Sequence, residues 1–123
     1  MRFMSIVTSP QPDARPTPAL LEAMHKLADR EIKAGRMVDT AGLMPLATGA
    51  QVRIADGNLS VVDGPFVEAK EVIGGYAIFE LRSKEEAVAL AVEFMQLHKD
   101  HMPGWVGTCE VRAFAGFAGQ GPE

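Results

Sequence analysis

Two amphipathic helical segments, each preceded and followed by an apolar strand segment, constrain the fold of this chain most strongly. Thr17 can cap a helix with Pro18 at its first position, where a missing N–H costs nothing, and the apolar spacing predicts that this helix runs to about Ala34. Ser83 and Glu86 form a capping box that starts a second helix. The inward stripe of the first helix is predicted to hold Leu20 or Leu21, Met24, Leu27, Ala28, Glu31 and Ile32. The second helix is predicted to end near Asp100, and the flanking strands are predicted at residues 2–8, 37–41, 76–82 and 108–114.

A turn signal separates two short apolar segments in the middle of the chain. Asp56-Gly57-Asn58 lies between residues 51–54 and 59–62, which is typical of a tight β-hairpin. Two strand–helix–strand crossovers around an antiparallel sheet are typical of the α+β class, so we predict a ferredoxin-like fold with an inserted β-hairpin. We place one domain at residues 1–114 and expect the Gly-rich tail at residues 115–123 to fray.

The fifth strand segment is apolar on both of its faces. Ala77 and Phe79 alternate with Tyr76 and Ile78, whereas two helices can cover only one face of a sheet. A large apolar face left open is rare in monomers, so we expect two subunits to pack sheet on sheet as a symmetric homodimer. Glu80 falls on the second face and needs a partner or a wet cavity there, which suggests a pocket between the sheets.

The charge and composition of the chain argue against several classes of partner. The net charge is −4 and the sequence has no long basic run, so we expect neither nucleic acid nor an anionic membrane as a partner. No apolar run approaches the roughly 20 residues of a membrane span, and the apolar run at the amino terminus is too short for a signal peptide. The single cysteine, Cys109, cannot form an intramolecular disulfide and is expected to be a small buried apolar residue. We expect a cytoplasmic protein.

A charged turn segment before the fifth strand is the first candidate for a functional site. Asp63 begins a turn in which Pro65 stops the preceding strand, and Lys70 lies beside Glu71. If these side chains are buried, shifted pKa values would suit them for acid–base chemistry. In the alternative, Asp63 only forms the turn, and Lys70 and Glu71 make a surface ion pair in a solvated loop.

The carboxyl end of the second helix is the other candidate. His98 and His101 are three residues apart and therefore project from nearly the same face, and His98 extends the stripe that points to the sheet. Such a pair could bind a metal, relay protons or hold an anion, although no three-ligand signature accompanies it and we predict no metal and no cofactor. In the alternative, both cations only interact with the helix dipole. Tyr76 and Trp105 each offer a flat surface with one polar group, suited to a ligand pocket or to a core.

Several of these stretches together resemble a known family. They are Asp63-Gly64-Pro65-Phe66, Glu68-x-Lys70-Glu71, Gly74-Gly75-Tyr76, Ser83-x-Glu85-Glu86-Ala87, Ala41-Gly42-Leu43-x-Pro45 after Gly35, and the opening Met1-Arg2-Phe3-Met4. Over roughly residues 1–114 the chain is similar to the YCII-related family, specifically to its DGPF branch. The resemblance implies a dimeric ferredoxin-like α/β barrel. It also implies a DGPF-type protein of unassigned chemistry.

The histidine–aspartate pair suggested for the wider family does not carry over to this chain. Met24 occupies the expected histidine position, and Lys33 occupies the expected aspartate position. His25 lies one residue away, but one residue turns a helical side chain by about 100°. We therefore expect His25 on the helix surface.

Two functions are compatible with these features. The first is a protein that binds or transforms a small organic molecule in a pocket of the dimeric barrel, with Asp63, Lys70, Glu71, His98 and His101 as candidate catalytic residues and Tyr76, Glu80 and Trp105 lining the pocket. The alternative is a non-catalytic dimeric interaction or regulatory module. The sequence has no phosphate loop, dinucleotide fingerprint or nucleophile elbow that would name a reaction, so it leaves open whether the chain is an enzyme.

Overall fold

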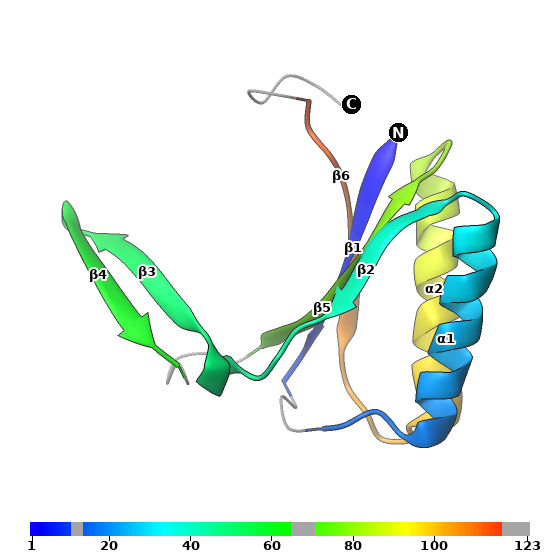
Figure 1. Cartoon of the computed structure of the whole chain (residues 1–123), viewed down its shortest axis with the longest axis horizontal. Helices are drawn as coiled ribbons and strands as arrows, with labels where there is room; N and C mark the ends of the chain where they lie inside the picture. Colours follow the sequence, from blue (N-terminus) through cyan, green and yellow to red (C-terminus); the bar gives the residue numbers. More distant parts are fainter. Residues whose placement is uncertain (11–13, 65–70, 117–123) are drawn as a thin grey trace.

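A computed structural model describes residues 1–10, 14–64 and 71–116 of the chain. It has six strands, two α-helices and one short 3₁₀ helix (Figure 1). In chain order these are β1 (Arg2–Ser9), α1 (Pro18–Lys33), β2 (Met37–Gly42), the 3₁₀ helix η1 (Leu46–Thr48), β3 (Ala50–Ala55), β4 (Asn58–Asp63), β5 (Val72–Glu80), α2 (Lys84–His101) and β6 (Thr108–Ala113). This order confirms the predicted succession of elements.

Four strands form one antiparallel sheet in the order β2-β5-β1-β6. Both helices lie against the same face of this sheet, and the β3–β4 hairpin projects on the other side (Figure 1). The α+β class is therefore confirmed, and the arrangement is compatible with a ferredoxin-like fold. Neither described helix is long and apolar enough to cross a membrane.

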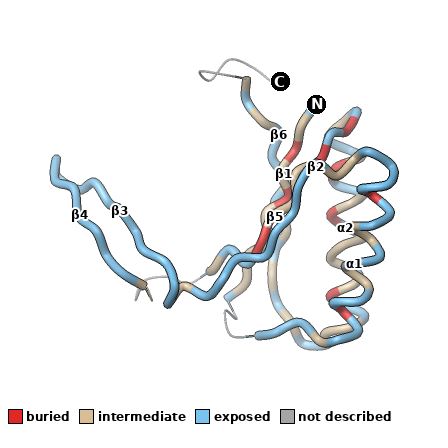
Figure 2. Tube along the Cα trace, in the orientation of Figure 1, coloured by how far each residue is buried: buried red, intermediate tan, exposed pale blue. Residues whose placement is uncertain are grey.

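The core lies between the sheet and the two helices, where the buried residues gather in Figure 2. Phe3 on β1 pairs with Phe79 on β5, and both side chains are buried beneath the helices together with Leu81. From α2, Ala87 and Ala91 face this layer. A helix turns 100° per residue, so Ala87, Ala91 and His98 share one stripe, which the sequence predicted.

Helix α1 begins as predicted, because the Thr17 hydroxyl accepts a hydrogen bond from the Leu20 backbone N–H and Pro18 occupies the first turn. Its buried stripe differs from the prediction at one position. Ile32 is 57% exposed, whereas Glu31 is fully buried. The stripe continues from Leu20 through Leu27 to Glu31, and Ile32 lies about 100° further around the helix.

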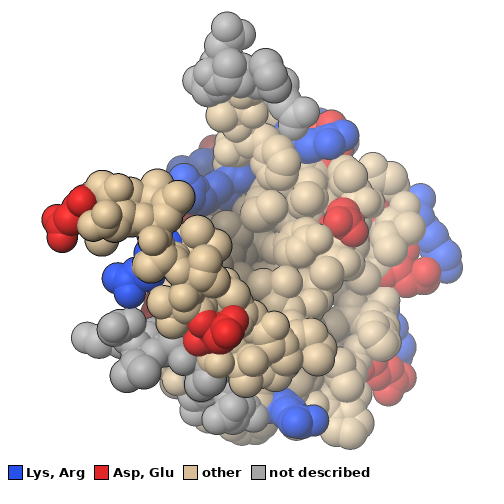
Figure 3. All heavy atoms as spheres, turned by 60° about the vertical axis from the view of Figure 1, so that its left-hand side comes forward, with Lys and Arg blue, Asp and Glu red and all other residues tan. Residues whose placement is uncertain are grey.

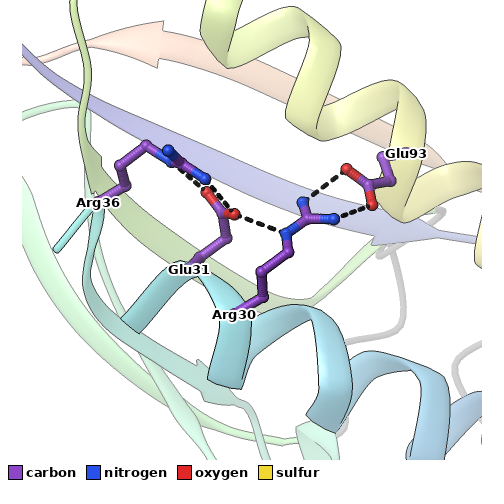
Figure 4. Close-up of polar contacts among 4 residues, drawn as sticks. All are labelled: Arg30, Glu31, Arg36 and Glu93. Carbon is purple, nitrogen blue, oxygen red and sulfur yellow. Dashed lines mark hydrogen bonds and ion pairs between the residues drawn. The ribbon is translucent and has the colours of Figure 1, made fainter. Parts of the chain in front are cut away.

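An ion-pair network explains how a carboxylate can be buried at that position (Figure 4). Arg36, just after the helix, donates from Nε and Nη2 to Glu31 at 2.7 Å each, and Arg30 donates from Nε at 2.9 Å. The Arg30 guanidinium also donates to both oxygens of Glu93 on α2, at 2.6 and 2.7 Å. Hydrogen bonding from Arg36 lowers the pKa of Glu31. The network fastens α1, α2 and the start of β2 to one another.

Strand β5 is longer than predicted at its start. It begins at Val72 instead of Tyr76, and both Gly74 and Gly75 lie within it. A Cβ atom at Gly75 would stand 2.9 Å from the carbonyl oxygen of Ala41 on β2. Glycine at this position therefore permits the close approach of the two strand backbones.

The predicted hairpin is present as a separate two-stranded sheet. Its turn residues Asp56 and Gly57 both have positive φ, at 52° and 77°, which is the conformation of a two-residue hairpin turn. Every residue of β3 and β4 is exposed, as Figure 2 shows. Of the predicted tail, Ala115 makes a single β-bridge, and residues 117–123 lie outside the described part of the chain.

Candidate functional site: the open face of the sheet

The sheet has one face that neither described helix covers, which we call the open face. Phe3 and Phe79 are buried under the helices, so the alternation of a strand directs Met4, Ile6 and Ile78 to the opposite side. Met4 lies opposite Ile78 in the register. These three side chains are half-buried and form an apolar floor across β1 and β5.

Tyr76 and Asp39 border this floor on the β2 side. Ile6 lies opposite Tyr76, and Asp39 lies opposite Ile78, so both polar residues belong to the open face. The Tyr76 hydroxyl donates to Oδ2 of Asp39 at 3.1 Å, while Oδ1 accepts from the Thr40 backbone N–H at 2.9 Å. The bond to Asp39 raises the pKa of Tyr76, so the phenol stays neutral at physiological pH. The pair offers a fixed carboxylate beside a phenol oxygen that can accept a hydrogen bond.

Glu80 borders the floor at the end of β5. It lies opposite Arg2, whose Nε is 3.6 Å from its carboxylate, and the amino group of Met1 is 3.0 Å away. The bond from that amino group is the main cause that lowers the pKa of Glu80. Glu80 is half exposed. The prediction that this carboxylate needs a partner on the second face agrees with these contacts.

Strand β6 supplies further polar groups. Glu110 lies opposite Ile6 and Arg112 lies opposite Met4, and their side chains form an ion pair at 3.5 Å. At the start of β6 the hydroxyl oxygens of Thr108 and Thr8, its partner on β1, are 3.0 Å apart. The apolar floor is thus bordered by both acidic and basic groups. Figure 3 shows this side of the molecule as a mostly uncharged surface behind the hairpin, with separate charged groups.

His98 and Trp105, which the sequence grouped with Tyr76 and Glu80, lie on the helix-covered side. His98 is 7% exposed, and its ring centroid is 4.4 Å from that of Trp105 and 4.7 Å from that of Phe94. Its Nδ1 donates to the Phe94 carbonyl at 3.1 Å. Burial lowers the pKa of His98, so the neutral ring serves as a packing element. The sheet therefore separates His98 and Trp105 from Tyr76 and Glu80, although the sequence assigned all four to one pocket.

His101 and His25 occupy less buried positions. The backbone carbonyl of His101 accepts a hydrogen bond from the Thr17 hydroxyl at 2.8 Å, which joins the end of α2 to the start of α1. His25 is exposed on α1, as predicted. Within the part of the chain that the structure describes, no three His, Cys, Asp or Glu side chains are grouped so that they could hold a metal ion.

Two described residues of the charged turn segment, Asp63 and Glu71, lie near the base of the hairpin. Asp63 is the last residue of β4 and Glu71 precedes β5, and both are exposed. Lys70 lies outside the described residues. No contact that the structure gives for Asp63 or Glu71 joins them to the open face.

A groove of about 510 Å³ between α2 and β6 was not predicted from the sequence. Most of the residues that line the groove are apolar, and two are lysines. The lining residues are Lys84, Val88, Ala91, Val92, Met95, Gln96, Lys99, Cys109 and Val111. Cys109 was expected to be a small buried residue, whereas the structure shows it half-buried, and this burial raises the pKa of its thiol. The sequence signal that could have indicated the groove is the pair Val88 and Val92, which are one helical turn apart and exposed.

Asp39 is the residue of the open face that sequence reasoning missed. It is a carboxylate in the middle of a short strand, between Val38 and Thr40. A charged residue within a strand segment indicates a face that is not buried by the same chain. That signal was present in the sequence.

Two comparisons relate the chain to known proteins. A family model for the YCII-related domain matches residues 1–97. An uncharacterized protein of Rhizobium meliloti (strain 1021) is 31% identical to the chain over 84 residues, which is 68% of the chain. The alignment spans 64% of the length of that relative.

Proposed function

Because the chain belongs to the YCII-related family, we propose that it binds or transforms a small organic molecule on the open face, in a pocket that a second copy closes. The DGPF motif at residues 63–66 places it, in this proposal, in the DGPF branch. One observation carries the proposal. The floor formed by Met4, Ile6 and Ile78 is apolar, is left half-buried by the residues that the structure describes, and is bordered by the Tyr76–Asp39 pair.

The chemistry of the open face defines the kind of molecule. An apolar body would lie over the floor and remove it from water, which contributes roughly 25 cal/mol for each Å² of apolar surface. A polar group at its edge would bond to the phenol oxygen of Tyr76 or to the carboxylate of Asp39. The ligand class that fits is a small, partly apolar compound that carries a hydroxyl or amino donor.

Closure by a second copy follows from the exposure of the floor. Ligand pockets bury most of the surface of their ligand, and one sheet face by itself cannot do so. A symmetric partner that packs against the open face would supply the second wall, as in the expected dimeric barrel.

The test is a thermal-shift screen with small alcohols, amines and phenols, followed by calorimetric titration of the compounds that stabilise the chain. Tyr76→Phe should weaken binding by up to about 10-fold, because it removes a neutral hydrogen-bond acceptor, and Asp39→Asn should weaken it by about 10- to 100-fold, because it removes the negative charge from the acceptor. The control is Val92→Trp, which fills the groove between α2 and β6 and should leave binding unchanged. Nuclear magnetic resonance of the bound compound over time then reports whether it is transformed.

Two outcomes would contradict the proposal. If Val92→Trp abolishes binding and Tyr76→Phe does not, the ligand occupies the groove. If no compound binds and the chain is nevertheless a dimer, the non-catalytic interaction module takes the place of the small-molecule site.

A further inference from the structure

The β3–β4 hairpin has one apolar face and one polar face. In the antiparallel register Val52 lies opposite Val61 and Ile54 lies opposite Leu59, and opposite residues share a face. We call these four side chains the apolar hairpin face. The other face carries Gln51, Arg53, Ala55, Asn58, Ser60 and Val62.

The apolar hairpin face is almost fully exposed. Val52, Ile54, Leu59 and Val61 are 71, 77, 72 and 70% exposed. Full burial of one such side chain stabilises a structure by about 1.5–3 kcal/mol. An isolated two-stranded hairpin is at best marginally stable in water, so a hairpin of this kind needs something to cover it.

The open face of the sheet is the second uncovered apolar surface of the chain. In Figure 1 the hairpin projects from the side of the sheet that faces away from both helices. One chain therefore presents an apolar arm and an apolar floor on the same side, and its own arm leaves its own floor uncovered.

We infer that the hairpin is an exchanged arm, which lies across the open face of a second copy and forms the wall of that copy's site. A two-fold axis would place the arm of each copy on the floor of the other. The two apolar hairpin faces and the two apolar floors of the dimer would then all be covered. The inference rests on the proposed function, because it specifies what closes the pocket over Tyr76 and Ile78.

The size of the surfaces fits this partner. Six residues at about 3.4 Å each and two strands about 4.8 Å apart give the arm a footprint of roughly 200 Å². Two arms on two matching sheet areas present about 800 Å² of flat footprint before side-chain relief is counted. Specific interfaces begin at about 1,200 Å² of accessible surface, so the two arms on their sheet areas would account for about two-thirds of that minimum.

The charge of the arm argues for a protein partner and against a membrane. Residues 50–63 contain one arginine, Arg53, and two aspartates, Asp56 and Asp63, which give a net charge of −1. Elements that bind anionic lipid carry lysine and arginine on their polar face. A second copy of this chain needs no such charge.

The first experiment compares two neighbouring substitutions that add the same charge to opposite faces of β4. Val61→Asp places a carboxylate on the apolar hairpin face, and Ser60→Asp places one on the polar face. Sedimentation velocity over a range of concentrations should show a dimer for the wild type and for Ser60→Asp, and a dissociation constant at least 100-fold higher for Val61→Asp. Circular dichroism should show the same helix content in all three, because both positions lie outside the core.

The second experiment locates the arm. In a Cys109→Ser background, Val52→Cys is labelled with a benzophenone maleimide, and ¹⁴N and ¹⁵N chains are mixed and irradiated. Mass spectrometry should find the label joined to residues 2–9 or 72–80 of the chain with the other isotope. A crosslink within one chain, or to the other chain's hairpin, overturns the inference.

The outcomes separate this inference from the proposed function. If Val61→Asp remains a dimer that binds ligand, the hairpin is not exchanged between the copies, and the open-face site stands. If the wild type is a monomer at every concentration, neither the exchange of the hairpin nor the closed pocket is correct.

Discussion

The two faces of the four-stranded sheet are built from the same strands, yet one is a buried apolar core and the other is a half-buried apolar floor bordered by polar groups. The helix-covered face holds Phe3, Ser5 and Phe79 at 2, 7 and 7% exposure. The open face holds Met4 and Ile78 in half-buried positions, next to charged and hydroxyl groups. Since successive residues alternate between the faces, each strand contributes to stability with one set of side chains and to a possible site with the other.

The comparison is tested most strongly by replacing two adjacent residues of β5. Phe79→Ala should lower the free energy of unfolding by about 3–5 kcal/mol, because it opens a cavity in the core. Ile78→Ala, on the open face, should cost less than about 1.5 kcal/mol in dilute protein. Urea denaturation at low protein concentration measures the free energy of unfolding of both variants. Equal losses of stability would mean that the open face is packed as tightly as the core.

The buried Glu31 gives the next largest effect. Glu31→Gln should lower the free energy of unfolding by about 2–3 kcal/mol, because it removes the charge from a fully buried side chain that accepts hydrogen bonds from Arg36 and Arg30, two arginines that are about half exposed. Glu93→Gln, whose carboxylate is 43% exposed, should cost under about 1 kcal/mol. Urea denaturation at pH 7 compares the stability of the two variants. A larger loss of stability in Glu93→Gln would contradict the conclusion that Glu31 is the central carboxylate of the network.

Two neighbouring glycines in β5 provide the third test. Gly75→Ala should destabilise the fold by about 1–3 kcal/mol, because the new Cβ would stand 2.9 Å from the Ala41 carbonyl and force β2 and β5 apart. Gly74→Ala meets nothing within 4 Å and should change stability by less than about 0.5 kcal/mol. Melting temperatures of both variants report the difference. If they are equal, β2 moves freely relative to β5.

The sequence predicted the elements better than the sites, and particular residues show why. Local chemistry specifies the Ser83 cap and the Asp56-Gly57 turn, and both are present as expected. The grouping of His98 with Tyr76 failed because the assignment of a residue to one side of the sheet depends on how helices pack, which no local pattern contains. Glu31 stood in the predicted stripe, but Glu93, which completes its network, is distant in sequence and carries no local sign of that contact.

The smallest effect concerns the pH dependence of the helix-covered face. Burial lowers the pKa of His98 below its ordinary value of 6.5. The unfolded chain therefore takes up a proton more readily than the folded chain, so the stabilising contribution is complete above pH 6.5 and is lost as pH falls through the folded pKa. The free energy of unfolding should not change by more than about 1.4 kcal/mol per pH unit for one proton.

His98→Phe keeps an aromatic ring beside Phe94 and Trp105 and should remove this pH dependence. His25→Phe, at an exposed position, should leave it unchanged. Urea denaturation between pH 5 and 7.5 measures the three proteins. A slope that persists in His98→Phe would show that another group titrates in this range, and that the buried ring is not the pH-sensitive element of the covered face.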